Sequence, residues 1–404
     1  MAATVAGYVP IGVNRRKRVG EGAARVQLLI DQPILNAALQ AIGRIVPRRP
    51  VVQGLGAVLL KAEGERLELA VTDLEGYAKV ALAAGVHAPG AASVEWQHFA
   101  RVVAALPSGQ VALSVSGSNR SLRITCGPSA FRLRTMSVED FPLLEPPQTW
   151  GFSISAEELA DMIARATFCA VDSDEGSPFF GVSVSVEASS LKLAATDNLQ
   201  LAYYVRPVES LWGAAAPGGF ATVVPTRGLN AFVRALGPLG DSRVDFALTE
   251  RRLWFRSGEL VWSVRALDTR YPDLTRYTGR LGGVRVVTSR SLLLEAVRQV
   301  SSLSDEGKST VVRLEGTRLH LASSHPEVGE AQTVVPLGAE YPKRIVWLNA
   351  NRFQNALRAQ PADEIALYLS EPLAPVAVVP ADESIGFRSF LTPLRYPAEE
   401  SEAI

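Results

Sequence analysis

The chain has 404 residues, of which 47% are hydrophobic, and its 41 lysines and arginines equal its 41 aspartates and glutamates. This length predicts about two to four globular domains. Because the net charge is zero, the overall charge alone does not draw this protein to nucleic acid or to an anionic membrane. Cys126 and Cys169 are too few for a disulfide framework, so both are expected to be small buried residues of a cytoplasmic protein.

The N-terminal segment, residues 1–24, is predicted to be a mobile tail. Its basic cluster, Arg15–Arg18, follows a weak apolar stretch, whereas a secretion signal has its basic residues before a strong one. The cluster either touches DNA phosphates or is simply solvated. No apolar run in the chain reaches the roughly 18–20 residues that span a bilayer, so no membrane partner is expected.

From residue 25 onward the chain repeats one unit three times. Asp73, Asp197 and Ser324 hold the same place in the three copies, about 125 residues apart, which is the spacing of a copied domain. Segments rich in Pro or Gly separate the copies and predict domains at 25–147, 148–280 and 281–404. Each copy has a helix-period segment, alternating strands, a second helix and more strands. The helices are expected at 33–46, 95–106, 155–169, 226–236, 289–303 and 349–360.

Each copy is predicted to be an α+β domain with two helices packed on antiparallel sheet. Strand alternation implies one covered face, and two helices are too few to cover both faces, so they are expected on the same side. Phe99, Phe232 and Phe353 occupy matching places in the second helices. Ser155 and Glu158 have the spacing of a capping box, which predicts where the helix of the second copy begins.

The predicted helices carry more basic than acidic residues. Arginine is a good helix former, so these charges could simply solvate the helix surfaces. The other interpretation is a positive face directed at a polyanion, because guanidinium groups pair well with phosphate. The count does not decide between them: the basic residues are Arg44, Arg101, Arg165, Arg227, Arg234, Arg290, Arg298, Arg352 and Arg358, and the acidic residues are Glu95, Glu157, Glu158, Asp161 and Glu295.

The patterns of catalysis and metal binding are missing. The four histidines do not stand in a metal-ligand pattern, and there is no Walker A loop, dinucleotide fingerprint or nucleophile elbow. Asp73 and Asp197 end strands and are expected to cap turns, while Asp172, Asp174 and Glu175 lie in a polar loop where solvation is the simpler role. The sequence therefore predicts a protein that is not an enzyme and uses no cofactor or metal.

Eight segments in order along this repeat resemble the bacterial sliding clamp family, the beta subunits of DNA polymerase III. The resemblance implies three clamp domains in a half ring that a second copy closes head to tail, with helices lining the hole. It implies a ring that encircles double-stranded DNA and tethers the polymerase. The segments are Val71–Glu75, Phe131–Leu144, Ala194–Ala202, Val223–Leu236, Arg265–Leu274, Leu292–Glu306, Glu327–Val335 and Phe390–Arg395.

The resemblance also implies two binding sites. DNA phosphates would meet Arg44, Arg48, Arg49, Arg101, Arg165, Arg227, Arg234, Arg298, Arg352 and Arg358. Short peptides of the polymerase and the clamp loader would enter a groove between the second and third domains. By position this groove comprises Phe179, Thr196, Asn198, Leu199, Gln200, Leu201, Pro272, Tyr277, Phe390, Thr392, Pro393 and Leu394.

The chain departs from the family pattern in the groove. Asn198-Leu199-Gln200 stands where the family usually has Gly-His-Arg, and Thr392 and Leu394 stand where it has methionines. A basic N-terminal tail and a neutral net charge are further departures. The alternative is therefore a clamp-fold paralogue that acts as an interaction or resistance protein with an altered groove.

Overall fold

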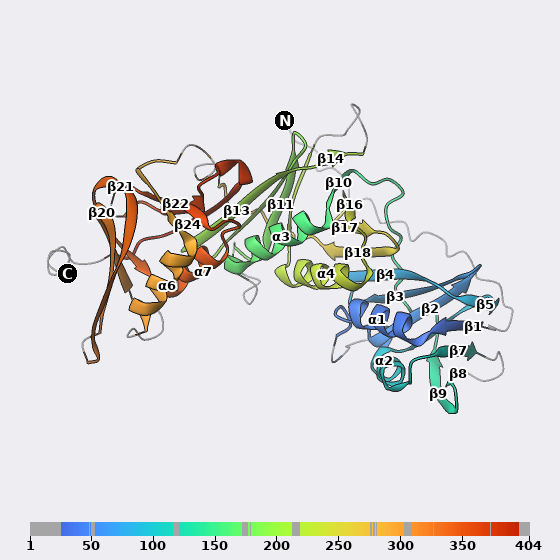
Figure 1. Ribbon diagram of the computed structural model, residues 1–404. Coiled ribbons are helices and arrows are strands. Elements are labelled where there is room, and N and C mark those ends of the chain that lie inside the picture. Colours follow the sequence, from blue (N-terminus) through green and yellow to red (C-terminus); the bar gives the residue numbers. More distant parts are fainter. Residues whose placement is uncertain are drawn as a thin grey trace, which may run out of the picture.

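The protein is described here by a computed structural model covering residues 26–47, 49, 53–115, 121–171, 177, 179–211, 219–274, 277, 279, 281–302, 309–325, 327–371 and 373–395. The predicted tail at 1–24, Arg48 and the loop carboxylates at 172–175 lie outside these residues. The described chain forms an arc, with all of its described helices along the inner edge and strands behind them (Figure 1). This arrangement confirms the α+β class and the placement of the helices on one side of the sheets.

The first repeat packs two helices against strands that belong to one continuous sheet. Its second helix, α2, is capped by Glu95, whose side chain accepts a hydrogen bond from the His98 N–H (3.2 Å). The same helix buries Phe99. The elements are β1 (Val26–Asp31), α1 (Gln32–Ile42), η1 (Gln53–Gly56), β2 (Ala57–Glu63), β3 (Arg66–Thr72), β4 (Gly76–Ala83), β5 (Gly85–Ala88), β6 (Gly90–Glu95), α2 (Trp96–Ala105), β7 (Gln110–Val115), β8 (Ser121–Cys126) and β9 (Ser129–Met136).

The second repeat has the same order of elements. The predicted capping box is wrong, because the Ser155 side chain makes no capping hydrogen bond; the Ala156 N–H instead donates to the Ser242 carbonyl at 2.8 Å. The elements are β10 (Phe152–Ser155), α3 (Ala156–Ala166), η2 (Thr167–Cys169), β11 (Val182–Glu187), β12 (Ser190–Thr196), β13 (Gln200–Pro207), β14 (Glu209–Ser210), β15 (Phe220–Val224), α4 (Thr226–Leu239), β16 (Arg243–Thr249), β17 (Arg252–Ser257) and β18 (Leu260–Arg265).

The third repeat keeps both helices but joins its first strands differently. In the second repeat β11 turns through Ala188 and Ser189 and pairs with β12, whereas β20 runs straight through the corresponding turn at Gly316 and stays paired with β21. A long two-stranded ribbon results, with its register shifted beside Gly316. The elements are β19 (Val284–Ser289), α6 (Arg290–Ser301), β20 (Ser309–His325), β21 (Gly329–Asn349), α7 (Ala350–Arg358), β22 (Glu364–Leu369), β23 (Val376–Pro380), η4 (Glu383–Ile385) and β24 (Phe387–Leu391).

Backbone hydrogen bonding joins the repeats into one arc. β18 of the second repeat pairs antiparallel with β4 of the first, and β13 pairs with β24 of the third. These pairings produce sheets of fourteen and eight strands that cross both junctions. A sheet shared between domains restricts hinge motion, because bending would break ladder hydrogen bonds.

The buried core lies between the helices and the sheets of every repeat. Phe99, Phe232 and Phe353 are fully buried at matching places, as their spacing in the sequence predicts. Cys126 and Cys169 are free and buried, which confirms their expected role as small apolar residues. With the helices packed by their apolar faces, their polar faces are left for the inner edge of the arc.

Candidate functional site

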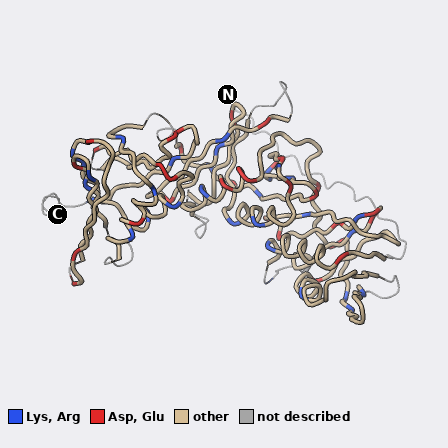
Figure 2. The backbone as a smooth tube through the Cα atoms, in the orientation of Figure 1, with Lys and Arg blue, Asp and Glu red and all other residues tan. Residues whose placement is uncertain are grey.

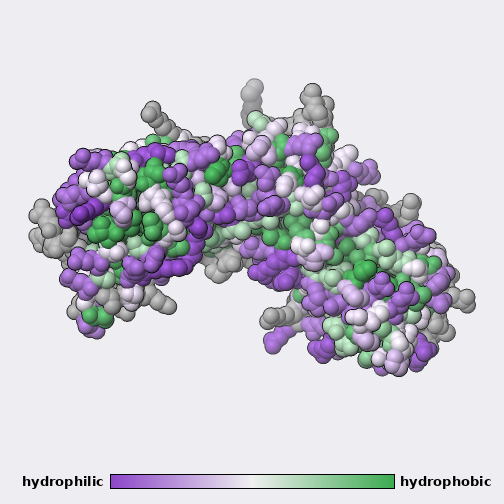
Figure 3. Space-filling model, in the orientation of Figure 1, coloured by the Kyte–Doolittle hydropathy of each residue, from purple (hydrophilic) through white to green (hydrophobic). Residues whose placement is uncertain are grey.

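The inner edge of the arc carries the arginines of the helices. Hydrophilic side chains gather along this edge, and lysines and arginines are distributed along the helices that form it (Figures 2 and 3). Seven of the predicted DNA-binding arginines lie on five of the six described helices, while Arg44 and Arg49 lie in the segment that follows α1. Six of them are exposed and have no ion-pair partner among the described residues: Arg44, Arg49, Arg101, Arg227, Arg234 and Arg298.

Three of the predicted arginines are held by partners in the same chain. Arg165 on α3 binds Asp161 with its Nε (2.7 Å) and the Ala359 carbonyl with its Nη1 (2.7 Å). Arg352 lies 3.7 Å from an Asp197 carboxylate oxygen. Arg358 donates to the side chains of its helix neighbours Gln354 and Asn355. The positive charge available on the inner edge is therefore unequal between the two junctions.

A tight turn at Thr196–Gln200 forms one wall of the predicted peptide groove. The Thr196 hydroxyl donates to the Gln200 carbonyl (2.6 Å) and accepts from the Asn198 N–H (3.0 Å), while Asp197 accepts from the Gln200 N–H (2.8 Å). Asn198 has a φ of 72°, which asparagine tolerates better than most residues. Because these hydrogen bonds hold the turn, it presents its backbone and side chains to the groove in a fixed arrangement.

The first repeat contains the same turn at the other junction. Thr72 donates to the Gly76 carbonyl (2.7 Å) and Asp73 accepts from the Gly76 N–H (2.6 Å). The two aspartates thus cap turns, as their places in the sequence predict. The environments behind the turns differ, because Tyr77 lies opposite Ser263 at one junction and Leu201 lies opposite Phe390 at the other.

A hollow of about 180 Å³ lies beside the Thr196–Gln200 turn at the junction of the second and third repeats. Nine of the twelve predicted groove residues line it: Phe179, Thr196, Asn198, Gln200, Leu201, Pro272, Tyr277, Phe390 and Thr392. Leu199, Pro393 and Leu394 do not; Leu199 is 41% exposed and its carbonyl accepts from the Thr392 N–H. The sequence analysis missed Asp273, Leu274, Pro375 and Leu391, of which Asp273 and Leu391 adjoin predicted residues that also line the hollow.

A second hollow of about 320 Å³ adjoins the first. Tyr277 and Phe390 line both hollows, and their rings pack at a centroid distance of 5.3 Å. Leu281, Tyr368 and Ala377 add apolar surface on the far side of this pair. Two adjoining hollows are therefore separated by an aromatic pair.

Tyr271 supports the groove from behind. Its hydroxyl accepts a hydrogen bond from the Thr196 N–H at 2.9 Å, and burial raises the pKa of the phenol well above its usual value. Phe141 is the corresponding residue at the other junction and has no hydroxyl. No sequence signal distinguished Tyr271 from the rest of its aromatic-proline corner.

Chemistry beyond binding has little support in these residues. Among the residues that the structure describes, no group of three or more His, Cys, Asp or Glu side chains is placed to hold a metal ion. Burial raises the pKa of the Cys169 thiol, which keeps it protonated and unreactive. Within the same described ranges, no helix is long and apolar enough to cross a membrane.

An arc of three similar α+β units, with arginine-bearing helices inside and a peptide-sized groove outside, defines a ring-forming DNA clamp. The chain belongs to the DNA polymerase III beta subunit family: residues 26–145 match the model of its N-terminal domain and residues 153–273 that of its central domain. As a member of this family it is a DNA sliding clamp, a processivity factor without catalytic activity. The family therefore implies DNA and a polymerase as partners, and dimerisation.

Known clamps match nearly the whole chain. The beta sliding clamp of Synechococcus elongatus is 28% identical over 365 residues, covering 88% of this chain and 96% of the relative. That of Proteus mirabilis is 26% identical, covering 87% and 95%. The solved DNA polymerase III subunit beta of Pseudomonas aeruginosa superposes with a TM-score of 0.82 at 25% identity, covering 92% of this chain and 100% of that one. The Bacillus subtilis clamp, at 18% identity and a TM-score of 0.85, shares the fold.

Proposed function

We propose that two copies of this chain close head to tail into a ring around double-stranded DNA and tether the replicative polymerase to it. The observation that carries this proposal is the placement of arginine-bearing helices on the concave side of an arc stiffened by shared sheets. We also propose that the domain boundaries lie near residues 147 and 280 and that residues 281–404 form the third clamp domain.

Ring closure is supported by complementary ends of the arc. β9 pairs with β6 only at Ser93↔Met136 and Val94↔Thr135, so its Phe131–Arg134 stretch is paired on one side only. Phe131 is 38% exposed there, and an edge strand with exposed apolar side chains favours pairing with another chain.

The charges at the two ends also complement each other. Arg123 and Arg132 are directly opposed on β8 and β9, and Arg134 lies beside them; like charges in such a cross-strand pair destabilise the free edge. At the other end, Glu295 on α6 and Glu330 on β21 are exposed, close to an exposed Leu292. Heterologous pairing of a basic edge with an acidic one closes a ring of two copies.

DNA is held without sequence readout in this proposal. The inner arginines come from helix surfaces that run along the arc and would meet phosphates, and phosphate contacts fix no base sequence. A ring that slides needs such contacts to be weak and exchangeable. Arg49 and Arg298 extend the basic surface beyond the first junction.

The groove between the second and third repeats is proposed to take short peptides of the polymerase and the clamp loader. Apolar walls from Leu201, Phe390 and Tyr277 would provide affinity, and the rigid Thr196–Gln200 turn would provide shape. A solved clamp of Pseudomonas aeruginosa, at 24% identity, is bound to griselimycin. Tethering through such a groove raises the effective concentration of the polymerase at the primer end without new chemistry.

Topological retention on DNA tests the proposal directly. The protein is loaded by its clamp loader onto nicked circular plasmid, and bound protein is measured before and after the plasmid is linearised. Retention on circles and loss from linear DNA are expected. Equal retention on both forms would refute encirclement. The alternative, a clamp-fold interaction or resistance protein that does not load, receives no support from relatives that are all named as clamps.

A further inference from the structure

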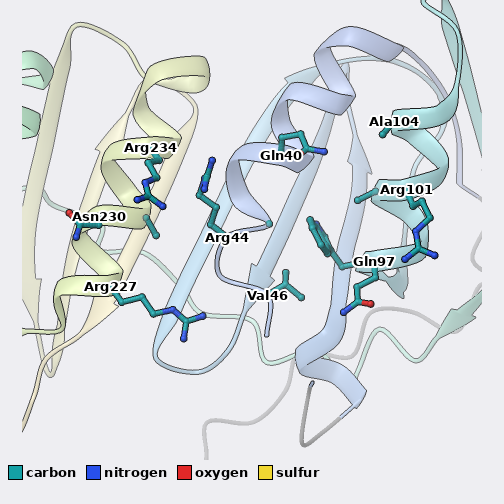
Figure 4. A pocket seen from close by; sticks show the side chains of 13 residues that line it. Gln40, Arg44, Val46, Gln97, Arg101, Ala104, Arg227, Asn230 and Arg234 are labelled. Carbon is teal, nitrogen blue, oxygen red and sulfur yellow. The ribbon is translucent and has the colours of Figure 1, made fainter. Parts of the chain in front are cut away.

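A hollow of about 780 Å³ opens among α1, α2 and α4 at the junction of the first and second repeats. Four arginines line it from three separate elements. Figure 4 shows Arg44 between α1 and α4, with Arg227 and Arg234 facing it from α4, and Arg101 on α2 across the hollow. Because all three helices lie on the inner edge of the arc, the hollow opens toward the channel.

The charge of this hollow is unbalanced. None of its four arginines has an ion-pair or hydrogen-bond partner for its side chain among the described residues. Burial raises the pKa of the Asp73 carboxyl, and the positive charge of Arg227 partly offsets this rise. The Asp73 Oδ1 already accepts a hydrogen bond from the Gly76 N–H at 2.6 Å. Guanidinium groups gathered without a carboxylate repel one another, so an anion that enters relieves this repulsion.

The indole of Trp96 forms part of the lining of the same hollow. Its Nε1–H is buried without an acceptor among the described residues, although buried polar groups normally have one. Gly43 makes room for the ring, because a Cβ at this position would stand 1.9 Å from Trp96 Cζ2 and 2.8 Å from the Leu39 carbonyl oxygen. The hollow therefore depends on a glycine at the end of α1.

The opposite junction offers no comparable set of free cations. Arg165, Arg352 and Arg358 are bound to in-chain acceptors there, two of them across the junction itself. A polyanion in the channel is consequently stabilised more by electrostatic attraction to the α1–α2–α4 side than to the α3–α7 side. This difference follows from side-chain partners and not from the number of arginines.

We propose that the hollow holds neighbouring backbone phosphates of one DNA strand, so that the duplex leans on the junction of the first and second repeats instead of occupying the centre of the ring. The proposal rests on the DNA-encircling function. Arginine forks bind phosphate oxygens bidentately. The contacts are blind to base sequence, so the lean persists while the ring slides.

The test compares two matched pairs of substitutions. Arg227→Gln with Arg234→Gln removes two cations of the hollow, and Arg352→Gln with Arg358→Gln removes two from the other junction. Affinity for a short duplex is measured by fluorescence anisotropy between 50 and 200 mM salt. Two lost phosphate contacts lower the salt slope by about 2 and reduce the affinity lost over this range by about tenfold. The second pair is expected to change the slope by less than half as much, and equal changes would overturn the proposal.

Two further measurements separate the possible sources of phosphate. Inorganic tripolyphosphate is expected to compete with duplex DNA for the wild type and to lose this competition in the Arg227→Gln, Arg234→Gln variant. If tripolyphosphate binds through these arginines without displacing DNA, the hollow serves a free polyphosphate and the proposal fails. Gly43→Ala, which pushes Trp96 into the hollow, is expected to lower the salt slope as the arginine pair does. Retention on circular plasmid is scored separately, because its loss would overturn encirclement itself.

Discussion

Replacing Tyr271 with phenylalanine isolates the support behind the peptide groove. The substitution removes one hydroxyl, and the Thr196 N–H that it accepted at 2.9 Å is left without that partner. A buried donor left unsatisfied costs about 1–3 kcal/mol of unfolding free energy. The other hydrogen bonds of the turn remain, among them those of the Thr196 hydroxyl, the Asn198 N–H and the Gln200 N–H, so the turn should loosen without being lost.

If disorder of the groove wall accounts for about 1 kcal/mol of this loss, and binding must restore the order, the dissociation constant of a bound peptide rises about fivefold. The assay is fluorescence polarisation with a labelled peptide that carries the clamp-binding segment of the host polymerase, paired with urea unfolding. Tyr203→Phe is the matched control, since it removes a hydroxyl on β13, the strand that follows the turn, and this hydroxyl has no hydrogen-bond partner among the described residues. Equal stability and equal peptide affinity in the two variants would refute the reasoning.

Three other outcomes follow from the structure. Leu201→Ala should weaken peptide binding by about tenfold, because Leu201 is an apolar wall of the hollow, while light scattering still reports a dimer. Arg132→Glu should weaken the dimer by about tenfold by placing an acidic residue against the acidic end of the partner, and an unchanged dimer would move the interface elsewhere. Asp363 accepts from Ser289 and Ser291 at the start of α6, which holds its pKa below the usual 3.8, so the stability it provides is complete above about pH 4 and lost as the pH falls through the lowered value. Asp363→Asn should therefore destabilise the protein at pH 7 and converge with the wild type once the pH has fallen below the lowered pKa of Asp363, as measured by urea unfolding.

The departures at the groove now have a structural meaning. Asn198 occupies a left-handed position that the turn requires, and Gln200 keeps its backbone bond to Asp197. The exposed Leu199 stands outside the hollow, so the change at this position alters the rim and not the wall. The aromatic pair of Tyr277 and Phe390 lies between the two hollows and contributes to the lining of both.

The sequence by itself determined the repeated architecture of this protein. Hydrophobic periodicity is a local property, so it located all six described helices, the buried phenylalanines and the capped turns at Asp73 and Asp197. The resemblance to the clamp family, and not periodicity, placed most of the groove, because Thr196–Leu201 and the segment from Phe390 match contiguous motifs of that family. The helix of the second repeat begins directly after Ser155, as the sequence predicts, but the Ser155 side chain makes no capping hydrogen bond, and the Ala156 N–H donates to the distant Ser242 carbonyl.

Only the tertiary structure decided which groups are free to bind. Arg165 and Arg227 look alike in the sequence, but the first reaches a carbonyl of the next repeat and the second reaches none. The same holds for Tyr271, whose partner lies 75 residues away, and for β20, which passes straight through the turn that its counterparts make. Pairing between distant segments depends on the assembled geometry, so it cannot be predicted from the residues that adjoin each partner in the sequence.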